Sequence, residues 1–233
     1  MKIGGLQKTT LIDYPGKIAC TVFLIGCNFR CPFCYSPELV LPEKIKFQPR
    51  ISEKNFFAFL KHKKKYLNGV VVCGGEPTLH SDLASFLAKI KKMGFEVKLD
   101  TNGSRPKILK KLIDEKLVDY IAMDVKAPLD EEFYQKTIGK RGFVETVKKS
   151  INLIKESSID YEFRTTVVPT IHRLSDIIKI AKQIGPAKRY YLQNFRPEKT
   201  LNPNITTIKP FSDEELKKVI EKIRNFFDDC KLR

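Results

Sequence analysis

Six short runs of apolar and β-branched residues alternate with segments of helical pattern along this chain, and this alternation constrains its fold most strongly. The runs occupy residues 18–25, 70–73, 96–99, 120–125, 161–168 and 189–193. Parallel strands need a long crossover, usually a helix, between them. Right-handed crossovers keep consecutive strands adjacent and curl the sheet. We therefore expect an α/β fold with parallel strands, arranged as an incomplete (β/α)6 barrel.

The length of 233 residues suits one domain of this kind. We expect a single domain with an N-terminal extension at 1–17, a partial barrel core at 18–211 and a C-terminal helix at 212–233. Residues 2–16 are expected to form a hairpin, and residues 37–50, rich in proline and charge, a connecting loop. The predicted helices cover residues 52–66, 82–93, 107–115, 144–155, 174–184 and 212–227.

Composition narrows the class of protein. No apolar run approaches the length of a membrane span, and the N-terminus lacks the apolar segment of a signal peptide, so we expect a cytoplasmic protein without a membrane partner. The chain has 43 Lys and Arg against 27 Asp and Glu. These lysines are scattered over helical segments, which favours solvated helix faces over a nucleic-acid surface, although an anionic partner remains compatible with the charge.

Three of the six cysteines lie within eight positions, as Cys27, Cys31 and Cys34. Thiolates are soft ligands for iron or zinc, and a zinc site or an ordinary iron–sulfur cluster needs four ligands. This loop offers three and leaves one metal position open for chemistry. Three free cysteines would not be expected to gather around Arg, Asn and Pro, because free cysteine behaves as a small hydrophobe. The other three cysteines lie singly.

Polar motifs follow several of the predicted strands. The carboxyl ends of parallel strands are where α/β folds keep their chemistry. We therefore expect these motifs to converge with the cysteine loop on one edge of the sheet. The motif residues are Gly74, Gly75, Glu76, Asp100, Thr101, Asn102, Asp124, Lys126 and, within the fifth strand, Arg164.

The cysteine loop, with Phe33 before the last cysteine, resembles the cluster loop of the radical S-adenosylmethionine (SAM) enzymes. In that family three cysteines hold a [4Fe–4S] cluster, the fourth iron binds SAM, and an electron from the cluster cleaves SAM to methionine and a 5′-deoxyadenosyl radical. The resemblance places Phe33 near the adenine, although it could simply shield the cluster. Tyr35 stands where relatives often have His, and we expect a backbone contact with the cofactor there.

The other motifs resemble further parts of that family. Gly74, Gly75 and Glu76 resemble a motif that contacts the methionine amino group of SAM. The segment from Asp100 resembles the Asp-Thr-Asn-Gly of glycyl-radical activating enzymes. In those relatives Asp and Thr, with an aspartate from the next strand, help bind a monovalent cation.

The implied cation ligands here are Asp100, Thr101 and Asp124, with Lys126 completing an Asp-x-Lys motif. Two acids facing one pocket would repel each other unless a cation or Lys126 lies between them. Arg164 would either meet SAM, as the resemblance implies, or form an ion pair with a strand acid such as Asp124. Asn102 is expected to contribute to the SAM site.

Residues 5–17 and 37–40 resemble the anaerobic ribonucleoside-triphosphate reductase activating proteins. This resemblance implies an enzyme that places a glycyl radical on that reductase, with reduced flavodoxin or ferredoxin as electron donor. Activation of another glycyl-radical enzyme, such as pyruvate formate-lyase, and radical chemistry on a small molecule are the alternatives. A non-catalytic iron–sulfur electron carrier and a zinc-containing nucleic-acid module are more distant ones.

Overall fold

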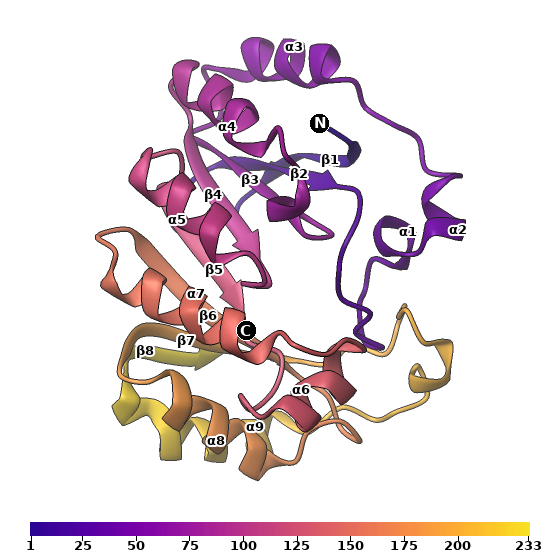
Figure 1. Ribbon diagram of the computed structural model, residues 1–233, viewed down its shortest axis with the longest axis vertical. Coiled ribbons are helices and arrows are strands. Elements are labelled where there is room, and N and C mark those ends of the chain that lie inside the picture. Colours follow the sequence, from indigo (N-terminus) through magenta and orange to yellow (C-terminus); the bar gives the residue numbers. More distant parts are fainter.

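The computed structural model describes residues 1–233 as one curved sheet with its strands in chain order (Figure 1). β1 is antiparallel to β2, and every later neighbour is parallel. The strands are β1 (Ile3–Thr10), β2 (Ala19–Leu24), β3 (Gly69–Gly74), β4 (Glu96–Thr101), β5 (Tyr120–Asp124), β6 (Asp160–Val167), β7 (Ala187–Asn194) and β8 (Phe227–Leu232).

The longer helices lie in an arc around the outside of this sheet (Figure 1). They are α3 (Glu53–Lys63), α4 (Leu83–Lys92), α5 (Pro106–Asp114), α7 (Val144–Glu156), α8 (Leu174–Ile184) and α9 (Asp213–Ile223). Shorter helices are α1 (Pro37–Val40), α2 (Pro42–Ile45) and α6 (Glu131–Ile138), and single 3₁₀ turns are η1 (Pro77–Leu79), η2 (Pro203–Ile205) and η3 (Arg224–Phe226). None of the helices combines the length and apolar character needed to cross a bilayer.

The expected parallel α/β architecture is confirmed. The six predicted core strands are β2 to β7, and they pair in sequence order as parallel neighbours. β1 and β8 do not pair with each other, so the sheet stays open instead of closing into a barrel.

Both ends of the chain differ from the prediction. The strand β1 pairs with β2, so the expected hairpin at residues 2–16 is wrong: its second strand is β2, and Pro15 and Gly16 lie in the connection between the two strands. The helix expected to run to residue 227 ends at Ile223. After the turn η3 the chain forms β8, which extends the sheet beside β7. The predicted connecting loop at 37–50 contains α1 and α2.

The two faces of the sheet have opposite character. The outer face and the helices bury a cluster of 49 apolar residues. The inner face carries Lys98, Asp100, Glu162 and Arg164, and its own apolar cluster contains only five residues. Because charged side chains cannot pack as a core, the inner face forms the wall of a polar chamber.

Candidate active site

A cavity of about 250 Å³ lies between the cysteine loop and the carboxyl ends of the strands. Every site residue predicted from the sequence lines it except Glu76. The predicted residues along its wall are Cys27, Cys31, Phe33, Cys34, Tyr35, Gly74, Gly75, Asp100, Thr101, Asn102, Asp124, Lys126 and Arg164. The fold therefore brings together motifs that are separated by more than a hundred residues in the chain.

The cysteine loop connects β2 to α1 and is held by its own backbone contacts. The Arg30 guanidinium donates hydrogen bonds to the carbonyl oxygens of Cys27 and Phe29, at 2.7 and 2.8 Å. All the cysteines are free thiols. Burial raises the pKa of Cys27 to about 11 and that of Cys31 to about 12. These thiols are protonated at neutral pH in the absence of a metal, and binding iron would release their protons.

The donor set of this loop, three soft thiolates, fits an iron–sulfur cluster with one open position. A mononuclear zinc site needs its sulfurs about 2.3 Å from one centre. Cysteines that each bind a different iron of a cluster stand further apart, and Cys27, Cys31 and Cys34 all line the same cavity.

The two glycines after β3 pack against the start of the cysteine loop. A Cβ atom on Gly75 would lie 2.0 Å from the carbonyl oxygen of Gly26, and one on Gly74 would lie 2.3 Å from the Leu24 nitrogen. The backbone N–H of Gly75 donates to Leu24 O, and that of Glu76 donates to Gly26 O. Only residues without a side chain permit this approach, which fixes where the loop leaves β2.

The Glu76 side chain is fully buried and braces the site from behind the cavity wall. Its carboxylate accepts hydrogen bonds from the Thr101 hydroxyl and from the backbone N–H groups of Asn102 and Thr78, at 2.8, 2.7 and 3.1 Å. Burial raises its pKa, while these hydrogen bonds act in the opposite direction. The contact of Glu76 with SAM stays a prediction, and the geometry adds a role in positioning the end of β4.

The Asn102 side chain faces the cysteine loop. Its amide donates to Asn28 Oδ1 at 3.0 Å and lies 3.9 Å from Cys27 Sγ. The Asn28 amide in turn donates to the Ser104 hydroxyl. The backbone N–H of Ser104 donates to Asn102 Oδ1, which closes the set of contacts. Sequence reasoning missed Asn28 and Ser104. Asn28 lies between two cysteines of the loop, and Ser104 directly follows the segment Asp100 to Gly103, so neither is one of the motif residues themselves.

An ion-pair network joins charged side chains of β4, β5 and β6 on the inner face of the sheet. Arg164 contacts Asp124 at 2.8 Å and Asp100 at 2.9 Å. Lys126 contacts Asp124 at 2.8 Å, and the buried Lys98 contacts Asp100 at 2.9 Å. Of the two alternatives for Arg164, the ion pair with Asp124 is present, and Arg164 lies between the two acids.

This network shifts the pKa values of Asp124 and Lys126. Burial alone would raise the pKa of Asp124, but the charges of Arg164 and Lys126 outweigh it and hold that pKa well below its usual range. Burial likewise opposes the charge on Lys126, yet Asp124 and the neighbouring Cys31 keep its pKa above its usual value. The chain itself supplies cations for both acids, so their repulsion does not require a bound monovalent cation.

Two aromatic residues and a histidine frame the cavity. The buried Phe33 ring lies 5.9 Å from Lys126 Nζ and 6.5 Å from the His172 ring. His172 Nδ1 accepts from the Val168 N–H, and its Nε2 donates to the Lys126 carbonyl at 2.8 Å, which gives this histidine a structural role. The Tyr35 hydroxyl accepts from the Arg196 N–H and so ties the cysteine loop to the segment after β7.

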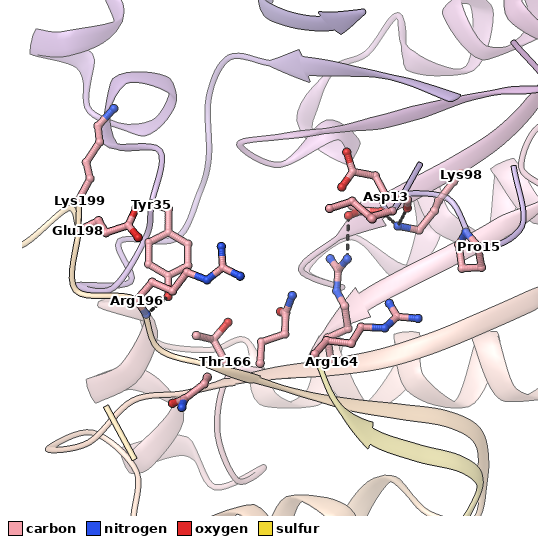
Figure 2. A pocket seen from close by; sticks show the side chains of 14 residues that line it. Asp13, Pro15, Tyr35, Lys98, Arg164, Thr166, Arg196, Glu198 and Lys199 are labelled. Carbon is pink, nitrogen blue, oxygen red and sulfur yellow. Dashed lines mark hydrogen bonds and ion pairs between the residues drawn. The ribbon is translucent and has the colours of Figure 1, made fainter. Parts of the chain in front are cut away.

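A second, larger cavity of about 870 Å³, here called the chamber, adjoins the first. Figure 2 shows Asp13, Pro15 and Lys98 on one side of it and Tyr35, Glu198 and Lys199 on the other. The residues common to both cavities are Tyr35, Asp100, Arg164, Thr166 and Gln193.

Comparison with known proteins agrees with this arrangement. The family model of the radical SAM superfamily matches residues 21–184. A protein of Methanocaldococcus jannaschii, provisionally named a glycyl-radical enzyme activating enzyme, is 31% identical over 99% of this chain and 95% of its own length. The pyruvate formate-lyase-activating enzyme of Clostridium pasteurianum is 26% identical over 78% of each chain.

Solved structures show the same fold at low sequence identity. QueE from Escherichia coli aligns with a TM-score of 0.58 at 17% identity, covering 100% of this chain and 93% of its own. SuiB of Streptococcus suis bound to SAM aligns with a TM-score of 0.64 at 16% identity, covering 91% of this chain and 51% of its own. With a family match across the strands that carry the cysteine loop and the polar motifs, this chain belongs to the radical SAM superfamily and is an enzyme that works with a [4Fe–4S] cluster and SAM.

Proposed function

We propose that this enzyme generates a glycyl radical on a partner protein, and that the partner is an anaerobic ribonucleoside-triphosphate reductase. The observation that carries the first part is the similarity, over nearly the whole chain, to a protein named as a glycyl-radical enzyme activating enzyme. Similarity to pyruvate formate-lyase-activating enzymes supports the same class of reaction. The choice of the reductase rests on residues 5–17 and 37–40, which resemble its activating proteins.

In this proposal Cys27, Cys31 and Cys34 hold the cluster and leave one iron for SAM. A cluster held there would supply the one electron needed for reductive cleavage of SAM, the chemistry by which a hydrogen atom is removed from the partner's glycine. The polar motif residues predicted from the sequence would bind and orient SAM. Asn102 holds the loop through Asn28 and lies beside Cys27 Sγ, while Gly74 and Gly75 fix the turn that supports it.

The ion-pair network keeps the cavity polar and rigid around the bound cofactors. Asp124 stays ionised between Arg164 and Lys126, so neither cation is free to move into the cavity at neutral pH. The buried Phe33 lines one side of the cavity, and Tyr35, which stacks on Phe195, lines it where it adjoins the chamber. Excluding water there would protect a reactive radical from side reactions.

The chamber supports a macromolecular substrate. It is wide, lined almost entirely by polar residues, and continuous with the cofactor cavity. The open sheet leaves it accessible, because β1 and β8 do not pair. A loop of another protein could reach the cofactors by this route, with the partner remaining outside. Reduced flavodoxin or ferredoxin is proposed as the electron donor, and the excess of basic residues would favour an acidic donor. Six free thiols suit the reducing cytoplasm as the site of action.

The test is anaerobic mixing of the reconstituted enzyme with SAM, a reductant and the reductase from the same organism. Electron paramagnetic resonance should then show a glycyl doublet only in the complete mixture. Pyruvate formate-lyase in place of the reductase tests the partner. SAM cleavage without a glycyl signal from either protein would contradict glycyl-radical activation and favour a small-molecule substrate, as in the similar 7-carboxy-7-deazaguanine synthase of Aquifex aeolicus, which is 27% identical over 66% of this chain.

A further inference from the structure

Two polar side chains stand where the cofactor cavity meets the chamber. Thr166 on β6 and Gln193 on β7 line both cavities. They are register partners on neighbouring parallel strands, so their side chains project from the same face of the sheet. Figure 2 shows Thr166 on the chamber wall between Arg164 and Arg196.

These two residues end a ladder of side chains on the inner face. The preceding pair along the same strands is Arg164 and Tyr191. Arg164 forms ion pairs with Asp100 and Asp124, and the Tyr191 hydroxyl donates to Asp229 at 2.6 Å. The Arg164 guanidinium and the Tyr191 hydroxyl therefore already have polar partners within the protein.

By contrast, the Thr166 hydroxyl and the Gln193 amide make no hydrogen bond within the protein, although both line the cavities. The neighbouring Thr165 hydroxyl donates to Val125 O, and the neighbouring Asn194 amide donates to Phe211 O. Thr166 and Gln193 together offer hydroxyl and amide donors and acceptors at one place.

The charges around this pair argue for a neutral group as their occupant. Arg164 and Lys98 each lie 2.9 Å or less from an aspartate, and an anion bound there would have to compete with Asp100 or Asp124 for these cations. Lys199 and Arg233 of the chamber lie 2.8 and 3.0 Å from Glu38 and Glu162. Arg196 is the one cation of the chamber without an ion pair. A peptide group carries one N–H donor and one carbonyl acceptor and no charge, which matches the amide of Gln193 and the hydroxyl of Thr166.

We propose that Thr166 and Gln193 are positioning residues that hold a peptide group of the partner's glycine segment at the entrance to the cofactor cavity. The proposal rests on the proposed function, because it assumes a protein substrate. Two-point binding of the main chain beside the reacting glycine would fix the direction of its Cα–H bond, and a small displacement of a reacting group strongly slows a reaction. Specificity for side chains would then be set elsewhere in the chamber.

The experiment compares Thr166→Val and Gln193→Leu, singly and together, with the matched changes Thr207→Val and Gln48→Leu in loops that line neither cavity. Each reconstituted variant is assayed for its dissociation constant for SAM and for the initial rate of glycyl-radical formation at several concentrations of the reductase. We expect the double variant to raise the KM for the reductase at least tenfold, with SAM affinity changed less than twofold. Thr166→Ser, which keeps the hydroxyl, should behave like the wild type, as should both loop variants.

The outcomes separate this inference from the proposed function. A wild-type enzyme that forms the glycyl radical, with a double variant of equal KM, would overturn the positioning role alone. A loss of SAM affinity as large as the rise in KM would assign the pair to the cofactor site and also overturn it. Absence of a glycyl radical with the wild-type enzyme and any partner tested would overturn both proposals.

Discussion

At the residue scale, the three cysteines of the loop are predicted to hold the cluster alone. Ala at Cys27, Cys31 or Cys34 should each abolish iron retention after anaerobic reconstitution. Cys73 on β3 also lines the cavity but lies alone in the sequence, so we do not expect it to replace a missing ligand. Iron and sulfide analysis with the absorbance of the cluster measures this. Cys230→Ala, on the edge strand β8, is the control and should bind iron fully. Full iron retention in Cys31→Ala would contradict the assignment.

Asp124 gives a prediction about stability and pH. Asp124→Asn leaves Arg164 and Lys126 without their shared acid, so we expect the apoprotein to lose on the order of 3 kcal/mol of unfolding free energy at pH 7. The folded-state pKa of Asp124 lies below its unfolded value. Its contribution is therefore fully present above the unfolded pKa near 4 and is lost as pH falls towards the folded pKa.

Urea unfolding of the wild type and Asp124→Asn at pH 7 and at pH 3 checks this sign. The difference between the two proteins should shrink at pH 3. If the difference in unfolding free energy stays constant or grows on acidification, then Arg164 and Lys126 do not lower the pKa of Asp124 as described here.

A substitution of Glu76 can distinguish its two proposed roles, which are binding SAM and positioning the end of β4. Glu76→Gln places an amide where Thr78, Thr101 and Asn102 all donate hydrogen bonds, so the apoprotein should lose about 1–3 kcal/mol of stability. If Glu76 also binds the ammonium of SAM, the affinity for SAM should fall by about 1–3 kcal/mol as well. Isothermal calorimetry and urea unfolding measure the two losses separately. Unchanged SAM affinity in a destabilised variant would leave only the bracing role.

Sequence motifs predicted where the site lies. The ion-pair network around the site could be identified only from the structure. Asp100, Asp124 and Arg164 lie on three neighbouring strands, and parallel pairing brings them together. Lys98 carries an early signal, since a lysine alternates there with apolar residues in a buried strand. Gln193 carries none, because an isolated glutamine at the end of a strand is compatible with any surface position.

At the scale of elements, Gly75 tests how the turn after β3 supports the cysteine loop. Gly75→Ala would place a Cβ against the backbone of Gly26, which cannot move without displacing the end of β2. We expect a larger loss of stability than for Gly94→Ala, where φ is +88° but the space is open. Thermal unfolding and iron content after reconstitution measure both effects. A Gly75→Ala protein as stable and as iron-rich as Gly94→Ala would contradict this role.

The elements were predictable where periodicity was strong. The core strands β2 to β7 and the helix α8 follow from apolar patterns with clear turn signals at their ends. β8 escaped prediction because Phe227–Leu232 carries two acids and a lysine and only Phe227 is well buried. The short helix α6 also went unpredicted. Asp130 caps its start, and Gly139 ends it in the left-handed conformation with φ of 68°, signals that stand out only once the loop after β5 is located.

At the scale of the whole molecule, the basic charge predicts salt-dependent activation. The chain carries a formal charge of +16, and exposed lysines would steer an acidic partner towards the chamber. Raising the ionic strength from about 0.05 to 0.3 M shortens the screening length, so the rate of activation at low partner concentration should fall. Glycyl-radical formation followed against time measures this, and an unchanged kcat at saturating partner is the control. A rate independent of salt would exclude electrostatic steering.

The central claim is that this radical SAM enzyme removes a hydrogen atom directly from a glycine of its partner. The most direct measurement uses reductase prepared with glycine deuterated at Cα, mixed anaerobically with the enzyme, SAM and a reductant. Mass spectrometry then reports the deuterium content of the 5′-deoxyadenosine formed. We predict one deuterium in each 5′-deoxyadenosine produced during activation. Formation of the full glycyl signal with 5′-deoxyadenosine that contains no deuterium would contradict the claim.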